Sequence, residues 1–196
     1  MRVEVVDTFG TDAKISRMAR ISYGKRSEKS EEDLSLFIGQ LLCNEHLVPF
    51  EHCSVTFYIE CPIYVARQIV RYRTAVISER SMRYCKPDTD GSFSDGDSAV
   101  DTAIAESYAQ SILCYEGLID RYKVPQEEAR KVLPLGINTE MYFTINLRNL
   151  FHLLEQRCSS HAQSETRDLA EQMLKAASER FPITFAELKK LYAFTA

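Results

Sequence analysis

The amino-acid sequence predicts an α+β fold, because a few segments with the two-residue period of strands are separated by longer segments with the period of helices. The strand candidates are 2–7, 54–60 and 140–145, and the longest helix candidate is 99–122. A chain of 196 residues is long enough to bury a sizeable core. We therefore expect a single domain that covers residues 1–196.

Composition excludes several classes of protein. Hydrophobic residues make up 45% and charged residues 27%, which is ordinary for a globular chain, and no run approaches the roughly 18 apolar residues of a membrane span. The first residues lack an apolar signal core. The six cysteines show neither a CxxC pair nor zinc spacing, and they lie in apolar stretches, as reduced cysteines of a cytoplasmic protein do. A net charge of −4 argues against general nucleic-acid binding.

The first third of the chain predicts a strand and two helices. Val3 and Val5 share one face of the strand, and a helix over 12–21 is expected to end before Gly24. Ser30 is predicted to cap the second helix, whose apolar stripe is Leu34, Phe37, Ile38, Leu41 and Leu42. Ser22, in the turn between them, is either a turn hydroxyl or a contact to an anion or cofactor.

Residues 46–52 are expected to form a loop, since Pro49 lacks the backbone N–H that a helix or central strand would use. Two histidines and a glutamate within seven residues, His46, Glu51 and His52, could be metal ligands. Their spacing is not that of a helical histidine pair, however, and no further cluster completes a ligand set. We predict no metal, and assign these side chains to ligand contacts or to a hydrogen-bonded turn.

A half-buried strand over 54–60 is followed by a predicted helix over 63–72, with Pro62 in its first turn. Ile63, Ala66 and Val70 are its expected buried residues. Gln68 and Arg71 are three residues apart, so the helix should carry them together on its exposed side. The apolar residues 75–77 are expected to fold back on the core.

The stretch from Arg67 to Tyr84 holds five arginines against one acid, Glu79. Such a cationic segment in an acidic chain suggests a bound anion, and the forked guanidinium group suits phosphate best. The alternative is a solvated surface rich in salt bridges. That alternative is disfavoured because the acids needed for pairing lie mostly elsewhere in the sequence, and because the stretch follows an apolar helix.

The middle of the chain is predicted to be a surface loop over 86–97 followed by the long helix 99–122. The expected buried stripe of that helix is Ile104, Ser111, Ile112, Tyr115, Leu118, Ile119 and Tyr122. Pro125 opens another helix that ends near Pro134, and Arg130 on it is a further candidate anion contact.

The last third begins with the strand 140–145, and Asn146 is predicted to cap a helix over 147–157. Arg148 and His152 share one face of this helix, and Arg157 ends it. A last long helix starts near Gln163. The sequence from Thr184 to Glu187 matches a capping box that would open a short terminal helix.

The stretch 71–84 resembles the signature of the flavin-dependent thymidylate synthases (ThyX), which runs Arg-His-Arg, two residues, Ser, one residue, Asn-Glu, one residue, Ser, one residue, Arg-Tyr. Three further segments resemble the same family in the same order, namely 46–52, 62–68 and 146–167. The four matches span nearly the whole chain, and four ordered matches are more specific than one.

The resemblance implies a ThyX-like fold, a mostly antiparallel sheet flanked by long helices, and a homotetramer whose FAD sites are built from several subunits. It implies transfer of a one-carbon unit from methylenetetrahydrofolate to C5 of UMP or dUMP, with NADPH reducing the flavin. It assigns catalytic roles to Arg157 and Ser81. It assigns the nucleotide to Gln68, Arg71, Glu79, Ser81, Met82, Arg83, Arg130 and Arg157. It assigns the flavin to Ser22, His46, Glu51, Arg71, Tyr72, Arg73, Thr74, Ser78, Glu79, Asn146, Arg148, His152 and His161.

Four positions depart from the family pattern. In the signature, Tyr72 replaces the histidine, Val76 replaces the first serine and Ser78 replaces the asparagine. His152 lies at a position where the family commonly has an amide side chain. The chain thus resembles a divergent branch of UMP/dUMP 5-methylases from nucleoside-antibiotic pathways.

Three alternatives remain open: a thymidylate synthase specific for dUMP, a non-catalytic nucleotide-binding relative and, weakest, an RNA-binding module. A mechanism through Cys85 or Cys158 is disfavoured, since neither thiol is paired with a cation or histidine in the sequence pattern.

Overall fold

The computed structural model describes residues 1–25, 31–87 and 99–192. The chain separates into two compact units, which are described one by one. The first consists of 1–59, 69–77 and 142–196, and the second of 60–68 and 78–141. The single domain expected from chain length stays a prediction.

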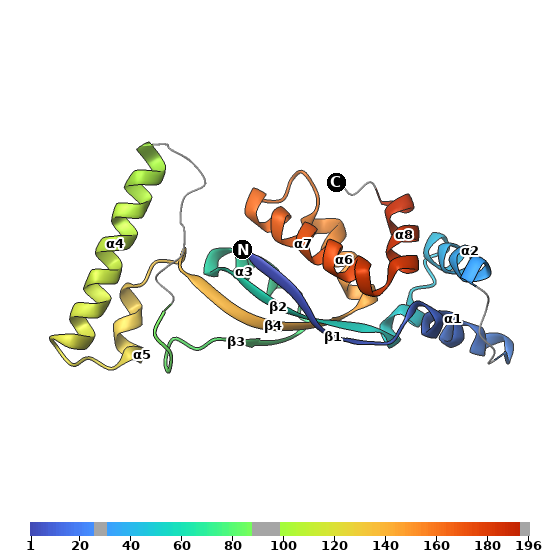
Figure 1. The fold of residues 1–196 in the computed structure, drawn as a ribbon, viewed down its shortest axis with the longest axis horizontal. Helices are drawn as coiled ribbons and strands as arrows, with labels where there is room; N and C mark the ends of the chain where they lie inside the picture. The colour runs from blue at the N-terminus through green and yellow to red at the C-terminus, as the bar shows by residue number, and fades with distance from the viewer. Residues whose placement is uncertain (26–30, 88–98, 193–196) are drawn as a thin grey trace. The chain divides into compact units, whose positions relative to one another are not determined.

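Within the described part of the chain, four strands form one antiparallel sheet in the order β1-β2-β4-β3 (Figure 1). Three of them are the predicted ones: β1 (Arg2–Phe9), β2 (Ser54–Pro62) and β4 (Asn138–Asn146). The fourth, β3 (Val76–Glu79), lies where the apolar residues 75–77 were expected to fold back on the core. That expectation is wrong for Val76, which is 70% exposed because β3 is an edge strand.

Strands β2 and β4 confirm the predicted alternation. On the buried face lie Val55, Phe57, Ile59, Met141, Phe143 and Ile145, none more than 2% exposed. On the opposite face the hydroxyls of Thr56 and Thr144 hydrogen-bond at 2.9 Å, and the rings of Tyr58 and Tyr142 lie 5.9 Å apart. Cross-strand pairs of this kind fix the register of neighbouring strands.

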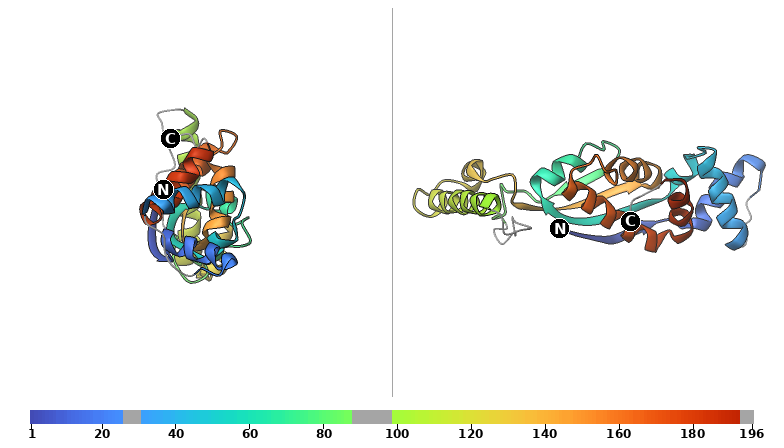
Figure 2. Two further views of the ribbon diagram at one scale, coloured as in Figure 1. Left: turned by 90° about the vertical axis from the view of Figure 1, so that its right-hand side faces the viewer. Right: turned by 90° about the horizontal axis from the view of Figure 1, so that it is seen from above.

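The first unit contains most of the helices. They are α1 (Asp12–Arg20), η1 (Ile21–Tyr23), α2 (Glu31–Cys43), η2 (Val48–His52), α6 (Leu147–Arg157), α7 (Ser164–Arg180) and α8 (Pro182–Leu191). Helix α7 packs along β1 and against α6, while α2 packs against α8. Figure 2 shows α6 and α7 over one face of the strands. The rings of Phe50, Phe151 and Phe185 meet edge to face in the core, at centroid distances of 5.3 and 5.7 Å.

Two helix starts test the capping predictions. The side chain of Asn146 accepts a hydrogen bond from the Asn149 backbone N–H at 2.9 Å, so Asn146 caps α6 as predicted. The prediction that a capping box at Thr184 opens the terminal helix is wrong, because α8 already begins at Pro182 and Thr184 lies inside the helix. Its hydroxyl donates to Asp12 instead. The predicted cap of α2, Ser30, lies outside the described residues.

The second unit holds α4 (Ala99–Asp120), which packs against α5 (Gln126–Ala129) and η3 (Arg130–Val132), as Figure 1 shows. The predicted buried stripe of α4 is only partly confirmed. Tyr115 is buried, but Ile104 and Tyr122 are exposed, since the short α5 and η3 cover little of a long helix. The expected loop 86–97 falls mostly outside the described residues.

Helix α3 (Ile63–Ile69) is shorter than predicted. Its fully buried residues are Val65, Ala66 and Ile69, in place of the expected Ile63, Ala66 and Val70. Because the helix ends at Ile69, Arg71 follows it in a turn and is not carried beside Gln68 on a helical face. Among the described residues, no helix combines the length and the apolar character needed to cross a membrane.

Candidate functional site

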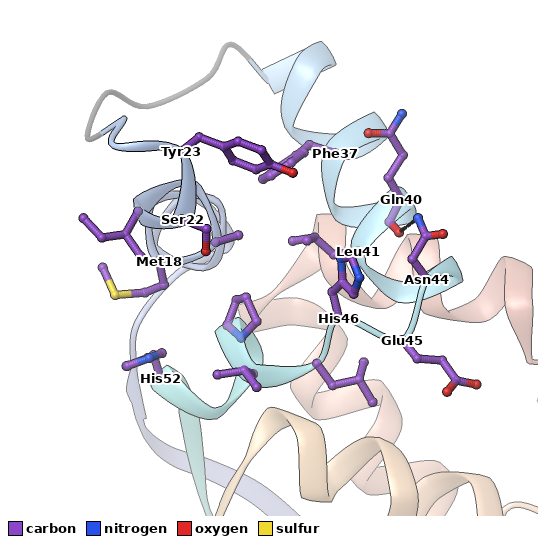
Figure 3. A pocket seen from close by; sticks show the side chains of 15 residues that line it. Met18, Ser22, Tyr23, Phe37, Gln40, Leu41, Asn44, Glu45, His46 and His52 are labelled. Carbon is purple, nitrogen blue, oxygen red and sulfur yellow. Dashed lines mark hydrogen bonds between the residues drawn. The ribbon is translucent and has the colours of Figure 1, made fainter.

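A cavity of about 670 Å3 opens in the first unit between η1, the end of α2 and η2. Met18, Phe37, Leu41 and Leu47 supply apolar walls. Its polar lining residues are Ser22, Gln40, Asn44, Glu45, His46 and His52. Ser22 and His46 come from two different walls and both face the cavity (Figure 3). Both were predicted to contact a cofactor.

Local backbone geometry places these two residues. Gly24 has a φ of +67°, a left-handed conformation that suits glycine, and its N–H bonds to the Ile21 carbonyl, which closes the turn holding Ser22. Glu45 is left-handed as well, with a φ of 55°. The N–H of His46 reaches back to the Leu41 carbonyl at 2.8 Å, a helix ending of the Schellman type. The ending of α2 therefore turns His46 into the cavity.

A second cavity of about 670 Å3 in the same unit shares Glu45 and Leu47 with the first. It is lined by four residues predicted to contact the flavin: Glu51, Thr74, Arg148 and His152. Arg148 donates to Glu51 in an ion pair between η2 and α6. Asn146, a fifth predicted residue, orients Arg148 indirectly, because it caps the helix on which Arg148 stands in the first turn.

The charge of the second cavity is negative, with Glu45, Glu51 and Glu155 against Arg148. A phosphate-bearing ligand would need further cations there. Arg71 and Arg73 lie in the turn just before Thr74, are exposed, and make no ion pair with any residue the structure describes.

Tyr72 stands at the centre of a small polar network. Its hydroxyl donates to Gln156 Oε1 at 2.7 Å, and Gln156 Nε2 lies 3.1 Å from His152 Nε2. The guanidinium of Arg157 lies over the Tyr72 ring, 5.5 Å from its centroid. Burial raises the pKa of Tyr72, and the charge of Arg157 partly offsets that rise.

In the second unit, two arginines of the arginine-rich stretch, Arg80 and Arg83, pair with acids from distant parts of the sequence. Arg80 pairs with Glu140 at 2.8 Å, and Arg83 pairs with Glu127 at 2.8 Å. Glu79 accepts a hydrogen bond from Thr139 at 2.9 Å. The expectation that pairing acids lie elsewhere is thus wrong for Arg80 and Arg83, because β4 and α5 bring Glu140 and Glu127 to them.

The other predicted residues are spread over both units. Gln68 and Met82 are half-buried in the second unit, where Arg130 is exposed and the Ser81 hydroxyl accepts from the Arg83 N–H at 3.3 Å. Ser78 is exposed in the second unit and His161 in the first. Arg157 belongs to the first unit, and Arg83 and Arg130 belong to the second. The roles of these residues stay predictions.

Several residues of the two cavities and of the Tyr72 network were not predicted from the sequence. Gln40 and Asn44 line the first cavity, and Asn149 lines the second. Gln156 joins Tyr72 to His152. A signal for Gln156 existed, since it stands four residues after His152 and next to Arg157 on one helix.

Two other kinds of site were weighed from the sequence, a reactive cysteine and a metal cluster. Burial raises the pKa of the Cys158 thiol to about 11, so that thiol is protonated at neutral pH. Cys85 is exposed. Within residues 1–25, 31–87 and 99–192, no group of three or more metal-binding side chains comes together.

Comparison with known proteins identifies the family. Residues 4–183 match the Thy1 family, described as thymidylate synthase complementing protein. The chain is 35% identical to flavin-dependent thymidylate synthases of Treponema denticola and Thermosipho melanesiensis, with 96% of the chain covered in each case and 79% and 90% of those proteins. It is also similar to the crystal structure of the UMP/dUMP methylase PolB from Streptomyces cacaoi bound with 5-Br dUMP. That match has a TM-score of 0.86 and 27% identity, over 97% of this chain and 95% of the other. A second structure of PolB, bound with 5-Br UMP, matches with a TM-score of 0.81.

The similarity to PolB agrees with the divergent branch predicted from Tyr72, Val76, Ser78 and His152. The family match covers most of the chain. It includes the arginine-rich stretch, every residue that lines the first cavity, and all the residues that line the second cavity except Leu188 and Tyr192. The chain therefore belongs to the flavin-dependent thymidylate synthase family, the Thy1 family of thymidylate synthase complementing proteins.

Proposed function

We propose that the protein is a flavin-dependent methyltransferase that methylates C5 of uridylate, as UMP, dUMP or both. One observation carries the proposal. Residues predicted to contact flavin, from Ser22 to His152 along the sequence, line two adjoining cavities of one unit in a chain of this family. The structural likeness to PolB, which was crystallised with brominated analogues of both nucleotides, supports either sugar.

The residues around the two cavities fit FAD. Cavities of this size with apolar walls and a few polar groups are typical of cofactor sites. Ser22 and His46 would hold one part of the cofactor and Thr74 and Arg148 another. Arg71 and Arg73 would offset the acidic lining next to a pyrophosphate. When bound, FAD reduced by NADPH supplies the reducing equivalents and methylenetetrahydrofolate supplies the carbon.

The arginines have two separate tasks in this proposal. Arg83 and Arg130 would bind the nucleotide phosphate, because guanidinium groups pair with phosphate in a fork. Arg157 would stabilise negative charge on the pyrimidine ring as C5 becomes nucleophilic. Gln68, Glu79 and Ser81 would orient the ring and sugar.

We also propose a homotetramer. The resemblance implies subunits that share their flavin sites, and the surface of α4 suits association. Val100 and Leu113 on this helix are both 67% exposed, which is unusual for large apolar side chains unless another surface covers them.

The function is tested by offering the purified protein FAD, NADPH and methylenetetrahydrofolate, with UMP and dUMP in separate reactions. We expect flavin absorbance on the protein and a product whose mass shows that one hydrogen of the substrate has been replaced by a methyl group. The Arg157→Ala variant should keep its fold, bind FAD and lose turnover. Protein that takes up no FAD, or that binds nucleotide without making methylated product, would contradict the proposal. The second result would favour a non-catalytic relative.

A further inference from the structure

The side chain of Tyr72 occupies a buried position between two helical residues, Gln156 and Arg157, that are adjacent in sequence. Tyr72 is 9% exposed, and its backbone is fixed in a turn: its N–H bonds to the Ile69 carbonyl at 3.2 Å and its carbonyl accepts from the Ala75 N–H at 3.0 Å. The ring therefore has little freedom to move.

The two ends of this tyrosine make different contacts. The hydroxyl is tied to Gln156, and the Gln156 amide continues to His152, whose ring also meets Tyr72 edge to face at 6.0 Å. The face of the ring lies under the Arg157 guanidinium. The Nε atom of Arg157 is buried as well. A long arginine side chain at the end of a helix loses rotamer freedom when it is stacked in this way.

We propose that Tyr72 is a positioning residue for Arg157: its ring holds the guanidinium in place for the nucleotide, and Gln156 and His152 hold the ring. The inference rests on the proposed function, because it takes uridylate as the ligand of Arg157. Tyr72 acts through Arg157 and needs no contact of its own with the nucleotide. It follows that the effect of changing Tyr72 must depend on the presence of Arg157.

The first measurement is a double-mutant cycle on unfolding, which needs no ligand. Urea unfolding is followed for wild type, Tyr72→Leu, Arg157→Ala and the double variant. We expect the two changes to couple by about fivefold in the folding equilibrium, as for a partly buried cation–π pair. Strictly additive effects would show that the ring does not hold the guanidinium, and would overturn the inference.

The second measurement is the Kd for UMP and dUMP by calorimetry, on the same variants and on two milder ones. Tyr72→Phe keeps the ring and removes the hydroxyl, so we expect binding about two- to tenfold weaker. Gln156→Leu should have a similar effect. Tyr72→Leu should weaken binding more, yet it should add nothing in the Arg157→Ala background. Tyr142→Phe, which removes the hydroxyl of a tyrosine in the same unit that is half exposed, is the matched control and should leave the Kd unchanged.

The outcomes separate this inference from the proposed function. If wild type binds a nucleotide and Tyr72→Leu weakens binding equally with and without Arg157, the inference fails and the function stands. If wild type binds neither nucleotide, the function fails and takes the nucleotide role of Tyr72 with it, while the unfolding cycle still decides whether Tyr72 holds Arg157. Thermal unfolding of Tyr72→Phe, expected to match wild type within a few degrees, excludes a general loss of folding.

Discussion

The carboxylate of Asp12 caps a helix whose first residues lie far away in the sequence. Asp12 Oδ1 accepts from the Thr184 N–H at 3.0 Å and Oδ2 accepts from the Ile183 N–H at 3.2 Å, both in the first turn of α8. The Thr184 hydroxyl adds a third bond to the same carboxylate. Asp12 itself is 7% exposed. A buried carboxylate thus satisfies N–H groups that a helix start leaves free, and it ties α1 to α8.

We expect the substitution Asp12→Ala to lower the free energy of unfolding by about 3 kcal/mol. It removes three hydrogen bonds to a carboxylate, and it leaves the buried Thr184 N–H and the partly buried Ile183 N–H without their acceptor. Urea unfolding measures the loss. Asp168→Ala is the control, because Asp168 is exposed on α7 and, among the described residues, accepts a hydrogen bond only from Gln172. A loss for Asp12→Ala no larger than that of the control would show that the capping contributes little.

The contact between Gly136 and Tyr108 predicts a rescue experiment in the second unit. A Cβ atom on Gly136 would lie 2.1 Å from the Tyr108 hydroxyl and 2.4 Å from Cε2, too close for either atom to remain in place. We expect Gly136→Ala to destabilise the packing of α4 by about 1–3 kcal/mol, and Tyr108→Ala in the same chain to recover part of the loss. Thermal unfolding of the single and double variants is the measurement. Equal stability of wild type and Gly136→Ala would contradict the prediction.

Glu127 pairs with Arg83, which we propose binds the nucleotide phosphate, so the charge of Glu127 should weaken nucleotide binding. We expect Glu127→Gln to tighten binding of UMP or dUMP a few-fold, measured by calorimetry at low salt. Stability should change by less than about 1 kcal/mol, because both partners of this pair are 49% exposed. Glu128→Gln, one residue later on α5 and paired with Lys131, is the control and should leave affinity unchanged. Weaker binding in Glu127→Gln would mean that the ion pair orients Arg83 for its ligand.

The buried thiol of Cys158 makes stability depend on alkaline pH. Burial raises its pKa from 9.0 to about 11 in the folded state. Below pH 9 the thiol is protonated in both folded and unfolded chains and its effect is constant. Between pH 9 and 11 the unfolded chain loses this proton first, so the free energy of unfolding falls, by about 2 kcal/mol.

Unfolding in urea at pH 8 and at pH 11 measures that fall. In Cys158→Ala the fall should be smaller than in wild type. In Cys114→Ala it should be unchanged, because Cys114 is exposed. The same loss of stability in all three proteins would assign the effect to other groups.

Local sequence was a good guide wherever the contacts that decide a structure lie within a few residues. The alternation of β2 and β4 and the capping of α6 by Asn146 needed only neighbouring residues, and the structure confirms them. Thr184 shows where local sequence fails to predict a structure. The residues from Thr184 to Glu187 match a capping box, but Asp12 caps α8 from the other end of the chain. No local pattern contains that partner. The same holds for Arg83, whose pairing with Glu127 joins residues 44 positions apart.

By itself the sequence determined the α+β class, three of the four strands, the limits of α6 and the family. Periodicity, capping residues and ordered motifs are properties of the chain in one dimension. Only the tertiary structure decided that Ser22 and His46 face one cavity while Glu51, Thr74, Arg148 and His152 share the next. It alone placed the Tyr72 ring under Arg157. Those neighbours are chosen by the packing of helices and strands around a common core, and packing depends on the whole chain at once.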